Sequence, residues 1–491
     1  MKTALVLLAM LLAADLLAQT KVVALRSQAP LVTFRIVFLT GAASDPASKP
    51  GVASLAAAML SQGGSREMSY KQILDAMFPM ATSVSSQVDK EMTVFSATTH
   101  VDNLEAFYKI FRAMLLDPGW RPEDFSRLRD DAINYLRVSL RGNNDEELGK
   151  EALYNEIYAG HPYGHHNLGT AGSLQRITLE DLRSFYKSHY GQDNLILGIA
   201  GGYPESFLER MKKDFGKLPA KTASAPEWKE PAAPRGIRVT MIEKDTRSVA
   251  YSMGFPITVR RGHPDYPALL VAQAYFGQHR TSGNRLYERM REIRGLNYGD
   301  YAYIEYFPRG MFQFEPDPNL GRRSQIFQIW IRPVEPPTAH FALRLALYEL
   351  DKLVREGLSR ESFEQWRSFV SKNVNLLTKT KDAELGYAID SQYYGIPDYN
   401  RYIKEGLARL TVDDVNKAVR KHLQAGNMQI VVVAKDCEDL RKKLISNEFS
   451  TMTYNSPKST EILEEDKLVG RFKIESRPEE VKILRVDTVF E

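Results

Sequence analysis

Histidines gather at one place in the chain, where their imidazoles could bind a metal ion. His161, His165 and His166 form a His-x-x-x-His-His pattern, and neutral imidazole is a common metal ligand. No carboxylate or cysteine stands inside this loop, so we expect the loop to be structural. The acidic run at residues 145–147 could supply a general base, but such a run is more typical of a solvated turn.

The composition narrows the classes of function. A chain of 491 residues is too long for one ordinary core and predicts two or more domains. With 43% hydrophobic and 26% charged residues, it is typical of a soluble globular protein. A net charge of +4 without a Lys/Arg run argues against a nucleic-acid partner. The single cysteine, Cys437, excludes an intramolecular disulfide, and we expect it to be buried as a small hydrophobe.

The first residues predict export. Lys2 precedes an apolar run at residues 4–14, and small residues follow, which is the pattern of a secretory signal peptide over residues 1–18. The alternative is a hydrophobic first helix of the folded protein. No later stretch approaches the roughly 18 apolar residues of a membrane span. We therefore expect an exported protein, periplasmic or secreted, without a membrane span.

One structural unit is used twice. Two stretches 233 positions apart each predict a capped helix, a short turn and a strand. Their matched residues are Thr178 and Thr411, His189 and His422, and Asn194 and Asn427. Residues 32–36 and Pro50 match residues 249–253 and Pro267 at an offset of 217. Residues 120–125 match residues 358–363 at an offset of 238. Such drifting offsets indicate duplication followed by insertions and deletions.

The repeat sets the expected domains. The first covers residues 21–222, an Ala/Pro-rich linker covers 223–234, and the second covers 235–445. A C-terminal extension follows at 446–491, and alternation over residues 481–490 predicts an added strand. Mixed strands and consecutive helices in each unit indicate the α+β class, as two homologous sandwich domains in tandem with helices covering one sheet face.

Three motifs together carry a family resemblance. Pro50-Gly51-Val52-Ala53 opens a helix after a strand, and His-Pro-Tyr-Gly occupies residues 161–164. Residues 285–298 are close to the signature Leu-Arg-Glu-x-x-Gly-Leu-x-Tyr. With the tandem units, the chain resembles the insulinase-like (pitrilysin) zinc peptidases and the subunits of mitochondrial processing peptidase. The resemblance covers nearly the whole chain after residue 20 and implies the insulinase-like metallopeptidase fold.

The family's zinc site is degenerate in this sequence. Its His-x-x-Glu-His motif supplies two zinc ligands and a general base, and a distal Glu completes the site. The resemblance places the ligands on Ser54 and Ala58, the base on Ala57 and the distal ligand on Asn134. Methyl groups bind no zinc and accept no proton. We therefore expect no catalytic zinc and no hydrolytic site of this chain's own.

The second-half signature is intact. In the family, its Arg and Tyr reach the zinc of the opposite half and hydrogen-bond the substrate backbone and the oxyanion. The resemblance gives these roles to Arg291 and Tyr298, and both side chains are suitable oxyanion donors. The alternative is a solvated helix residue and an amphipathic strand residue. The aromatic row of residues 298–306 could line a peptide chamber, with core packing equally expected.

These patterns predict a non-catalytic subunit of a heterodimeric zinc peptidase. A zinc-bearing partner chain would supply the metal, and this chain would supply Arg291 and Tyr298 in trans to a peptide substrate. A non-enzymatic structural or peptide-binding protein is the second hypothesis. Hydrolysis by an unrelated site is the third.

Overall fold

The computed structural model describes residues 21–232 and 234–491, so the predicted signal peptide at 1–18 lies outside the described residues. The first sheet has the order β1-β5-β2-β4-β3. Its strands are β1 (Lys21–Arg26), β2 (Leu31–Phe38), β3 (Val84–Val88), β4 (Thr93–His100) and β5 (Leu195–Gly201). β1 and β5 are parallel, and the other neighbours are antiparallel.

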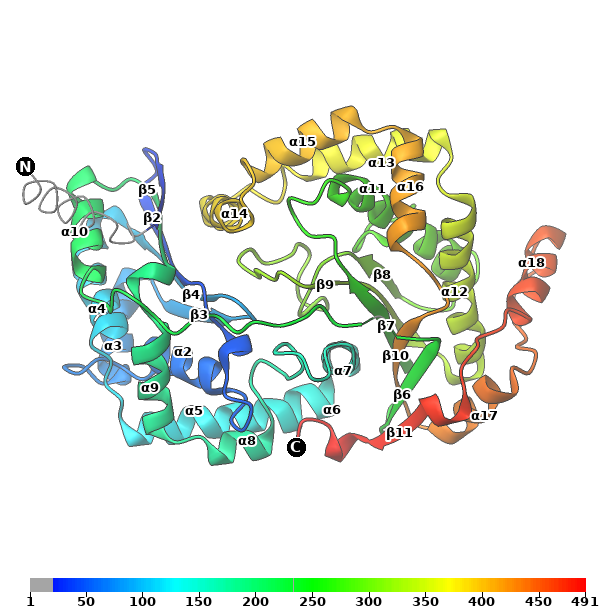
Figure 1. Cartoon of the computed structure of the whole chain (residues 1–491), viewed down its shortest axis with the longest axis horizontal. Helices are drawn as coiled ribbons and strands as arrows, with labels where there is room; N and C mark the ends of the chain where they lie inside the picture. The colour runs from blue at the N-terminus through cyan, green and yellow to red at the C-terminus, as the bar shows by residue number, and fades with distance from the viewer. Residues whose placement is uncertain (1–20, 233) are drawn as a thin grey trace, which may run out of the picture.

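The second sheet repeats this plan with one more strand, in the order β11-β6-β10-β7-β9-β8. Its strands are β6 (Ile237–Glu243), β7 (Val249–Ile257), β8 (Gly299–Tyr303), β9 (Gln325–Val334), β10 (Met428–Ala434) and β11 (Val481–Arg485). The strand predicted in the C-terminal extension is β11, which pairs in parallel with β6. Cys437 is buried, as expected. The fold class is therefore confirmed: two homologous halves of mixed helices and strands stand in tandem (Figure 1).

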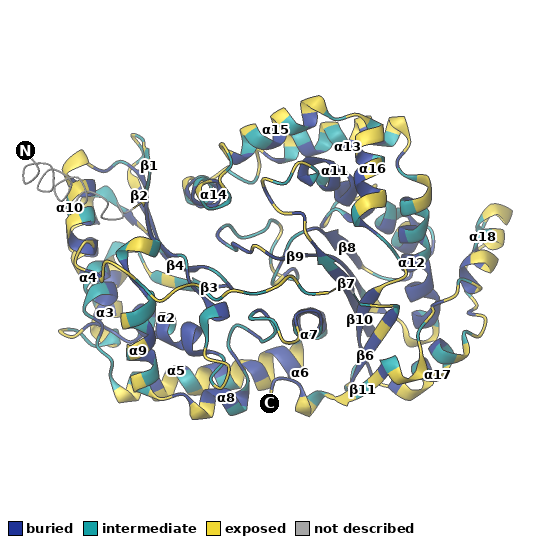
Figure 2. Cartoon of the chain, in the orientation of Figure 1, coloured by how far each residue is buried: buried dark blue, intermediate teal, exposed yellow. Residues whose placement is uncertain are grey.

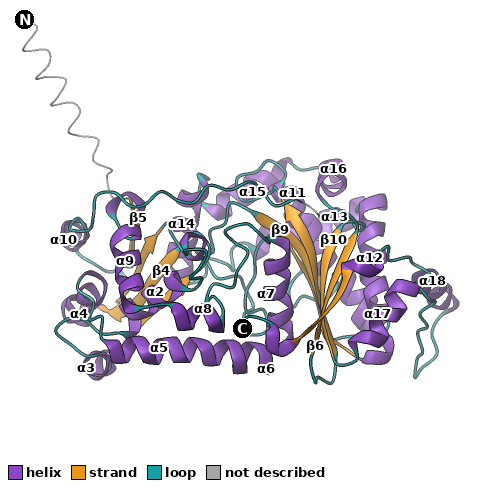
Figure 3. Cartoon of the chain, turned by 60° about the horizontal axis from the view of Figure 1, so that its bottom comes forward, coloured by secondary structure: helices purple, strands orange, loops and turns teal. Residues whose placement is uncertain are grey.

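Helices pack around both sheets (Figure 3). In the first half they are α2 (Val52–Gln62), α3 (Tyr70–Met77), α4 (Leu104–Leu116), α5 (Pro122–Asn134), α6 (Arg141–Asn143), α7 (Asp145–Ile157), α8 (Ala171–Arg176), α9 (Leu179–His189) and α10 (Glu205–Phe215). In the second half they are α11 (Tyr266–Gly277), α12 (Ala339–Glu356), α13 (Arg360–Asn373), α14 (Lys381–Tyr394), α15 (Tyr399–Arg409), α16 (Val412–His422), α17 (Cys437–Ser446) and α18 (Thr460–Gly470). None of the helices in residues 21–232 and 234–491 combines the length and apolarity that a membrane span needs.

Each half lends one helix to the other half's sheet. α7 comes from the first half but packs on β7 and β10, whereas α14 comes from the second half but packs on β1, β2 and β5 (Figure 1). Gly149 of α7 lies against Ser252 of β7, and Gly198 of β5 lies against Ile389 of α14. A Cβ at Gly198 would stand 2.7 Å from the Ile389 side chain, so glycine permits this close approach.

The exchange corrects the expectation that helices cover only one face of each sheet. Phe34 and Ile36 of β2 join the core beneath α2 and α4, whereas Val37 packs with Leu385 and Ile389 of α14. Because alternate residues of a strand point to opposite faces, a strand covered on both faces is buried along its length. β2, β5, β7 and β10 are buried along nearly their whole length, as the dark blue strands of Figure 2 show.

The acidic run at residues 145–147 is not a solvated turn, and that expectation was wrong. Asn144 caps α7, and Glu146 and Glu147 are only 3% and 4% exposed. Lys150, which is fully buried, lies 2.6 Å from Glu147. The carboxylates are buried because α7 passes between the two halves, a placement that no local sequence pattern reveals.

A buried ion pair holds the halves together. The Arg322 guanidinium, just before β9, makes two hydrogen bonds to Asp89, just after β3, at 2.5 and 2.7 Å. Both side chains are almost fully buried. The guanidinium also lies 3.4 Å from the centre of the Tyr306 ring. A buried carboxylate without its partner is strongly destabilising, so the halves depend on this contact.

Replacing Arg322 with Ala should therefore lower the free energy of unfolding by about 3–5 kcal/mol, measured by urea denaturation. Arg367→Ala is the matched control, because its partner Glu364 lies on the same solvent-exposed helix face. The control should change stability by less than about 1 kcal/mol. Equal losses in the two variants would contradict a special role for the Arg322 contact.

Candidate functional site

The start of α2 is built by its contacts with a distant loop. Asp45 accepts hydrogen bonds from the backbone N–H groups of Gly51 and Ala53, both at 2.7 Å. Gly51 has a φ of 103°, and a Cβ there would stand 2.4 Å from the Leu168 carbonyl oxygen. The family-like Pro-Gly-x-Ala sequence is therefore explained by a left-handed residue pressed against this loop.

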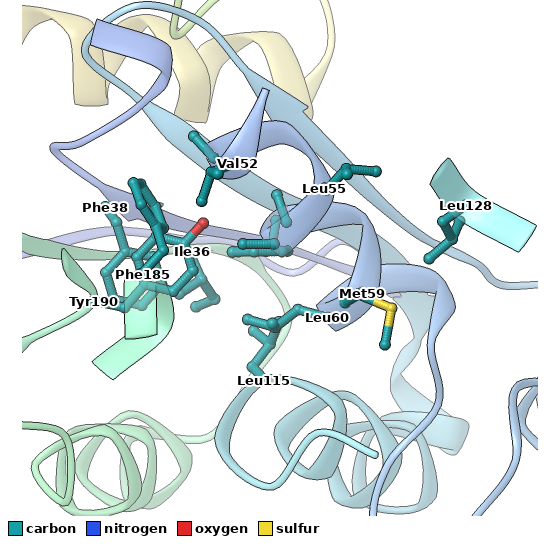
Figure 4. Close-up of a cluster of buried hydrophobic side chains, with 14 of the residues drawn as sticks. Ile36, Phe38, Val52, Leu55, Met59, Leu60, Leu115, Leu128, Phe185 and Tyr190 are labelled. Atoms are coloured by element: carbon teal, nitrogen blue, oxygen red, sulfur yellow. The ribbon is translucent and has the colours of Figure 1, made fainter. Parts of the chain in front are cut away.

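The four degenerate motif positions have different fates. The Ser54 hydroxyl donates to the Asn167 carbonyl oxygen at 2.6 Å, and Ala57 is fully buried in the core. Ala58 is half-buried, and Asn134 is exposed at the end of α5. Figure 4 shows the apolar side chains on α2 around these positions, including Leu55 and Met59. Nothing at the four positions can ligate zinc or act as the base.

A cavity of about 450 Å³ lies where the peptidase zinc would be. Ser54 and Ala58 line it from α2, and Tyr135 follows α5. Glu147 and Glu151 line it from α7. The cavity thus joins the first half's motif helix to the exchanged helix. Its polar lining comes from α7, the loop at 166–168, residues 85–89 and the segment before β9.

The acidic side chains of this cavity are already engaged. Glu147 pairs with Lys150 and accepts the Arg309 backbone N–H at 3.0 Å. Glu151 accepts the Tyr306 hydroxyl at 3.1 Å. Burial raises the pKa of both Glu147 and Glu151. These bonds engage the Glu147 carboxylate and one oxygen of Glu151 in contacts between the two halves.

The histidine cluster is structural, as expected. His165 lies 3.2 Å from Asp45 and so supports the cap of α2. His161 packs against Tyr163 and Trp228. His166 lines the cavity, and burial lowers its pKa to about 3. The three imidazoles point to different partners and share no metal position among the described residues.

Arg291 and Tyr298 lie against each other on the surface. The Arg291 guanidinium stands 4.2 Å from the centre of the Tyr298 ring and donates to the Tyr298 carbonyl oxygen at 3.2 Å. Gly295, with a φ of 62°, ends the helical turn, and its N–H donates to the Arg291 carbonyl oxygen. The chain then reverses over the buried Leu296. The Gly-Leu of the signature is thus the left-handed helix end that brings Tyr298 back to Arg291.

The pair is open to solvent and separate from the cavity. Tyr298 is 63% exposed, and neither residue belongs to the lining of the cavity at Ser54. No hydrogen bond of the Tyr298 hydroxyl is found within residues 21–232 and 234–491. Both side chains can therefore contact a group outside this chain.

The segment that carries Arg291 and Tyr298 is held in place by ion pairs. Arg289 and Arg294 flank Arg291 and bind Glu465 of α18 in the C-terminal extension. Arg289 also binds Glu349 of α12 at 3.1 Å. Arg294 is fully buried. The C-terminal extension, whose role the sequence did not indicate, thus fixes the turn that carries Arg291.

Asp300 is a site residue that sequence reasoning missed. It lies two residues after Tyr298, is 1% exposed, and neither carboxylate oxygen has a hydrogen-bond partner in the described chain. Burial raises its pKa to about 7, although Asn297 and Arg291 act in the opposite direction. Its only signal in the sequence is an acid inside an aromatic strand. Of the aromatic row, Tyr301 and Tyr303 pack with Trp330, whereas Tyr306 lines the cavity at Ser54.

Sequence and structure comparisons agree with this geometry. A family model described as "Insulinase (Peptidase family M16)" matches residues 21–171, and one described as "Peptidase M16 inactive domain" matches residues 176–368. A "Non-peptidase homolog YmxG" from Helicobacter pylori is 20% identical over 420 residues, covering 84% of this chain and 90% of the relative. A "Probable mitochondrial-processing peptidase subunit beta" from Arabidopsis thaliana is 26% identical over 197 residues, covering 40% and 36%.

A solved structure shows the same fold. The crystal structure of a peptidase M16 inactive domain from Pseudomonas fluorescens superposes with a TM-score of 0.72 at 23% identity. The match covers 85% of this chain and 96% of that chain. This likeness shows the tandem fold alone.

The pKa of Asp300 makes stability depend on pH. Its carboxyl takes up a proton in the folded state at a pH where the unfolded carboxyl, with its usual pKa near 3.8, is ionised. The folded state therefore loses stability as pH rises from about 4 to 7, by up to roughly 4 kcal/mol for this group. Asp300→Asn should remove that loss, so the variant should match wild type at pH 4 and exceed it at pH 7.5.

Urea denaturation at several pH values measures the difference. Asp439→Asn, at an exposed helix position, is the control and should leave the pH profile unchanged. A constant difference between Asp300→Asn and wild type across this range would show that the folded carboxyl titrates normally.

Proposed function

Because the chain belongs to the insulinase (peptidase M16) family, we propose that it acts as the non-catalytic subunit of a heterodimeric zinc peptidase. The partner subunit would carry the zinc and cleave or process peptides. This chain would contribute Arg291 and Tyr298 to the partner's site. The signal-like residues 1–18 further suggest that the complex works after export, in the periplasm or outside the cell.

The observation that carries the proposal is the placement of Arg291 and Tyr298. The chain is an inactive member of its family, since all four motif positions lack the necessary side chains. Its signature pair is nonetheless complete, exposed and held by the buried ion pairs of Arg289 and Arg294. A solvated surface pair does not need to be fixed by such ion pairs. A donor that must meet a developing oxyanion needs a fixed position, because rate enhancement depends on preorganisation.

The choice of side chains fits the chemistry. Arg291 offers a planar fork of N–H donors that can bind a substrate carbonyl. The contact with the Arg291 guanidinium orients the Tyr298 ring, whose side chain remains largely exposed. Neither residue faces the chain's own cavity at Ser54, which supports action in trans. No zinc is assigned to that cavity, and the catalytic metal would belong to the partner.

The second candidate is a non-enzymatic structural or peptide-binding protein of the same fold. The loss of the motif at Ser54 and Ala58 fits it equally, and the name "non-peptidase homolog" carried by one relative favours it. The two candidates differ in whether Arg291 and Tyr298 affect turnover of any complex. Peptide hydrolysis by the pure chain that resists chelators would instead favour an unrelated catalytic site.

We expect Tyr298→Phe to lower the turnover of the complex about 10²–10³-fold, because one oxyanion donor is lost. Partner binding should stay unchanged. The assay co-expresses this chain with a candidate partner that carries an intact His-x-x-Glu-His motif. It then compares kcat for a peptide substrate with the affinity of the two chains.

Tyr287→Phe is the matched control, since the Tyr287 ring also lies 5.0 Å from the Arg291 guanidinium but does not occupy the tyrosine position of the signature. Its kcat should equal that of wild type. If Tyr298→Phe keeps full turnover in an active complex, the pair has no catalytic role and the structural candidate is favoured.

A further inference from the structure

A cluster of metal-type side chains lies in the second half, outside the peptidase-type site. His263, Asp265 and His422 each offer one ligand atom, and these atoms all lie within 4.8 Å of one another. The three residues are half-buried. We propose that they bind one zinc ion, a use of the chain that is independent of Arg291 and Tyr298.

Two rigid elements position the ligands. His263 and Asp265 stand immediately before α11, and His422 is the last residue of α16. The two helices pack directly against each other. The loop before α11 is fixed as well, since the Tyr266 N–H donates to the His263 carbonyl oxygen at 3.0 Å. Metal sites mounted on packed helices are more precise than sites on free loops.

The ligand set favours zinc over the alkaline-earth ions. Two imidazole nitrogens and one carboxylate oxygen form a mixed set that suits Zn²⁺, whereas Mg²⁺ and Ca²⁺ prefer oxygen ligands alone. Three protein ligands would leave the fourth position to water. Zinc ligands lie about 2.0–2.2 Å from the metal, so small side-chain rotations must draw the three atoms together.

An ion pair between Asp265 and His422 is the competing explanation. Their side chains meet at 2.7 Å, and Lys421 lies 2.8 Å from the same Asp265 oxygen. In that explanation His263 takes no part in the ion pair: its Nδ1 accepts the Asp265 backbone N–H, and its ring packs edge-on against the His422 ring. The two explanations differ in the role of Lys421. It would compete with a metal ion for the Asp265 oxygen, but it would strengthen an ion pair between Asp265 and His422.

The repeat shows that this cluster is not part of the common scaffold. His422 matches His189 of the first half at the offset of 233. In the register that matches Pro50 with Pro267, His263 and Asp265 correspond to Pro46 and Ser48. The first half therefore keeps one histidine and lacks both partners. The duplicated scaffold therefore does not require these three residue types.

The proposed ion would join the start of α11 to the end of α16. It lies in a different half from Ser54 and Ala58, and it would supply no peptidase chemistry. A zinc ion at His263, Asp265 and His422 would differ from the expectation that this chain binds no metal. The positions Ser54, Ala58 and Asn134 would still bind none.

The test measures Zn²⁺ binding by the chelator-treated full chain in equilibrium dialysis. Wild type should bind one zinc ion at this site, and Mg²⁺ should not compete. His263→Gln and His422→Ala should each weaken zinc binding at least about tenfold, because even the loss of an outer contact costs 10–100-fold. Lys421→Met should strengthen zinc binding several-fold, because it frees the Asp265 oxygen.

His189→Ala and His166→Ala are matched controls and should leave zinc binding unchanged. Zinc should also raise the melting temperature of wild type but not that of His263→Gln. If His422→Ala fails to fold, His263→Gln, which is expected to fold, still tests the site. The inference is overturned if wild type binds no zinc. It is equally overturned if zinc binding survives in His263→Gln or is weakened by Lys421→Met.

Discussion

The reciprocal exchange of α7 and α14 is the constraint on which the rest of the structure depends. Each helix covers the sheet of the other half, so neither sheet has its full core without its neighbour. The exchange also forces charges into the interior, because α7 carries Glu146, Glu147 and Lys150 between the halves. These charges are stable there only as a paired set. The ion pair of Arg322 with Asp89 adds a second buried charge contact between the two halves.

The same constraint explains the cavity beside α2. In a peptidase of this fold, the space would hold zinc, water and substrate. In this chain the motif positions have lost their ligands, while Glu147 and Glu151 engage Lys150, Arg309 and Tyr306. The carboxylates nearest to the lost site therefore serve cohesion between the halves. Acids bonded in this way contribute to the contacts that hold the two halves together.

Much of the fold could be predicted from local pattern. The tandem repeat, the helix at Pro50 and the added strand at 481–485 all follow from capping, periodicity and alternation. The exchange of helices could not be predicted, because no local pattern in α7 or α14 indicates which sheet each helix packs on. For the same reason residues 145–147 were misread as a solvated turn. Asp300 and the His263 cluster escaped notice because their meaning depends on burial and on contacts between distant residues.

The zinc-motif positions on α2 are degenerate, whereas the signature with Arg291 and Tyr298 is intact. The cost of substitution to folding differs between the two regions. Replacing zinc ligands on α2 by Ala and Ser costs little, since Ala57 fills the core and the Ser54 hydroxyl finds the Asn167 carbonyl. The turn of the signature is harder to substitute, because folding depends on it. Gly295 provides its left-handed end and Leu296 its core contact, so both are held by folding alone. The half-buried Arg291 stacks on the Tyr298 ring, whereas Tyr298 itself is largely exposed. The proposed function rests on these two side chains and not on the turn that carries them.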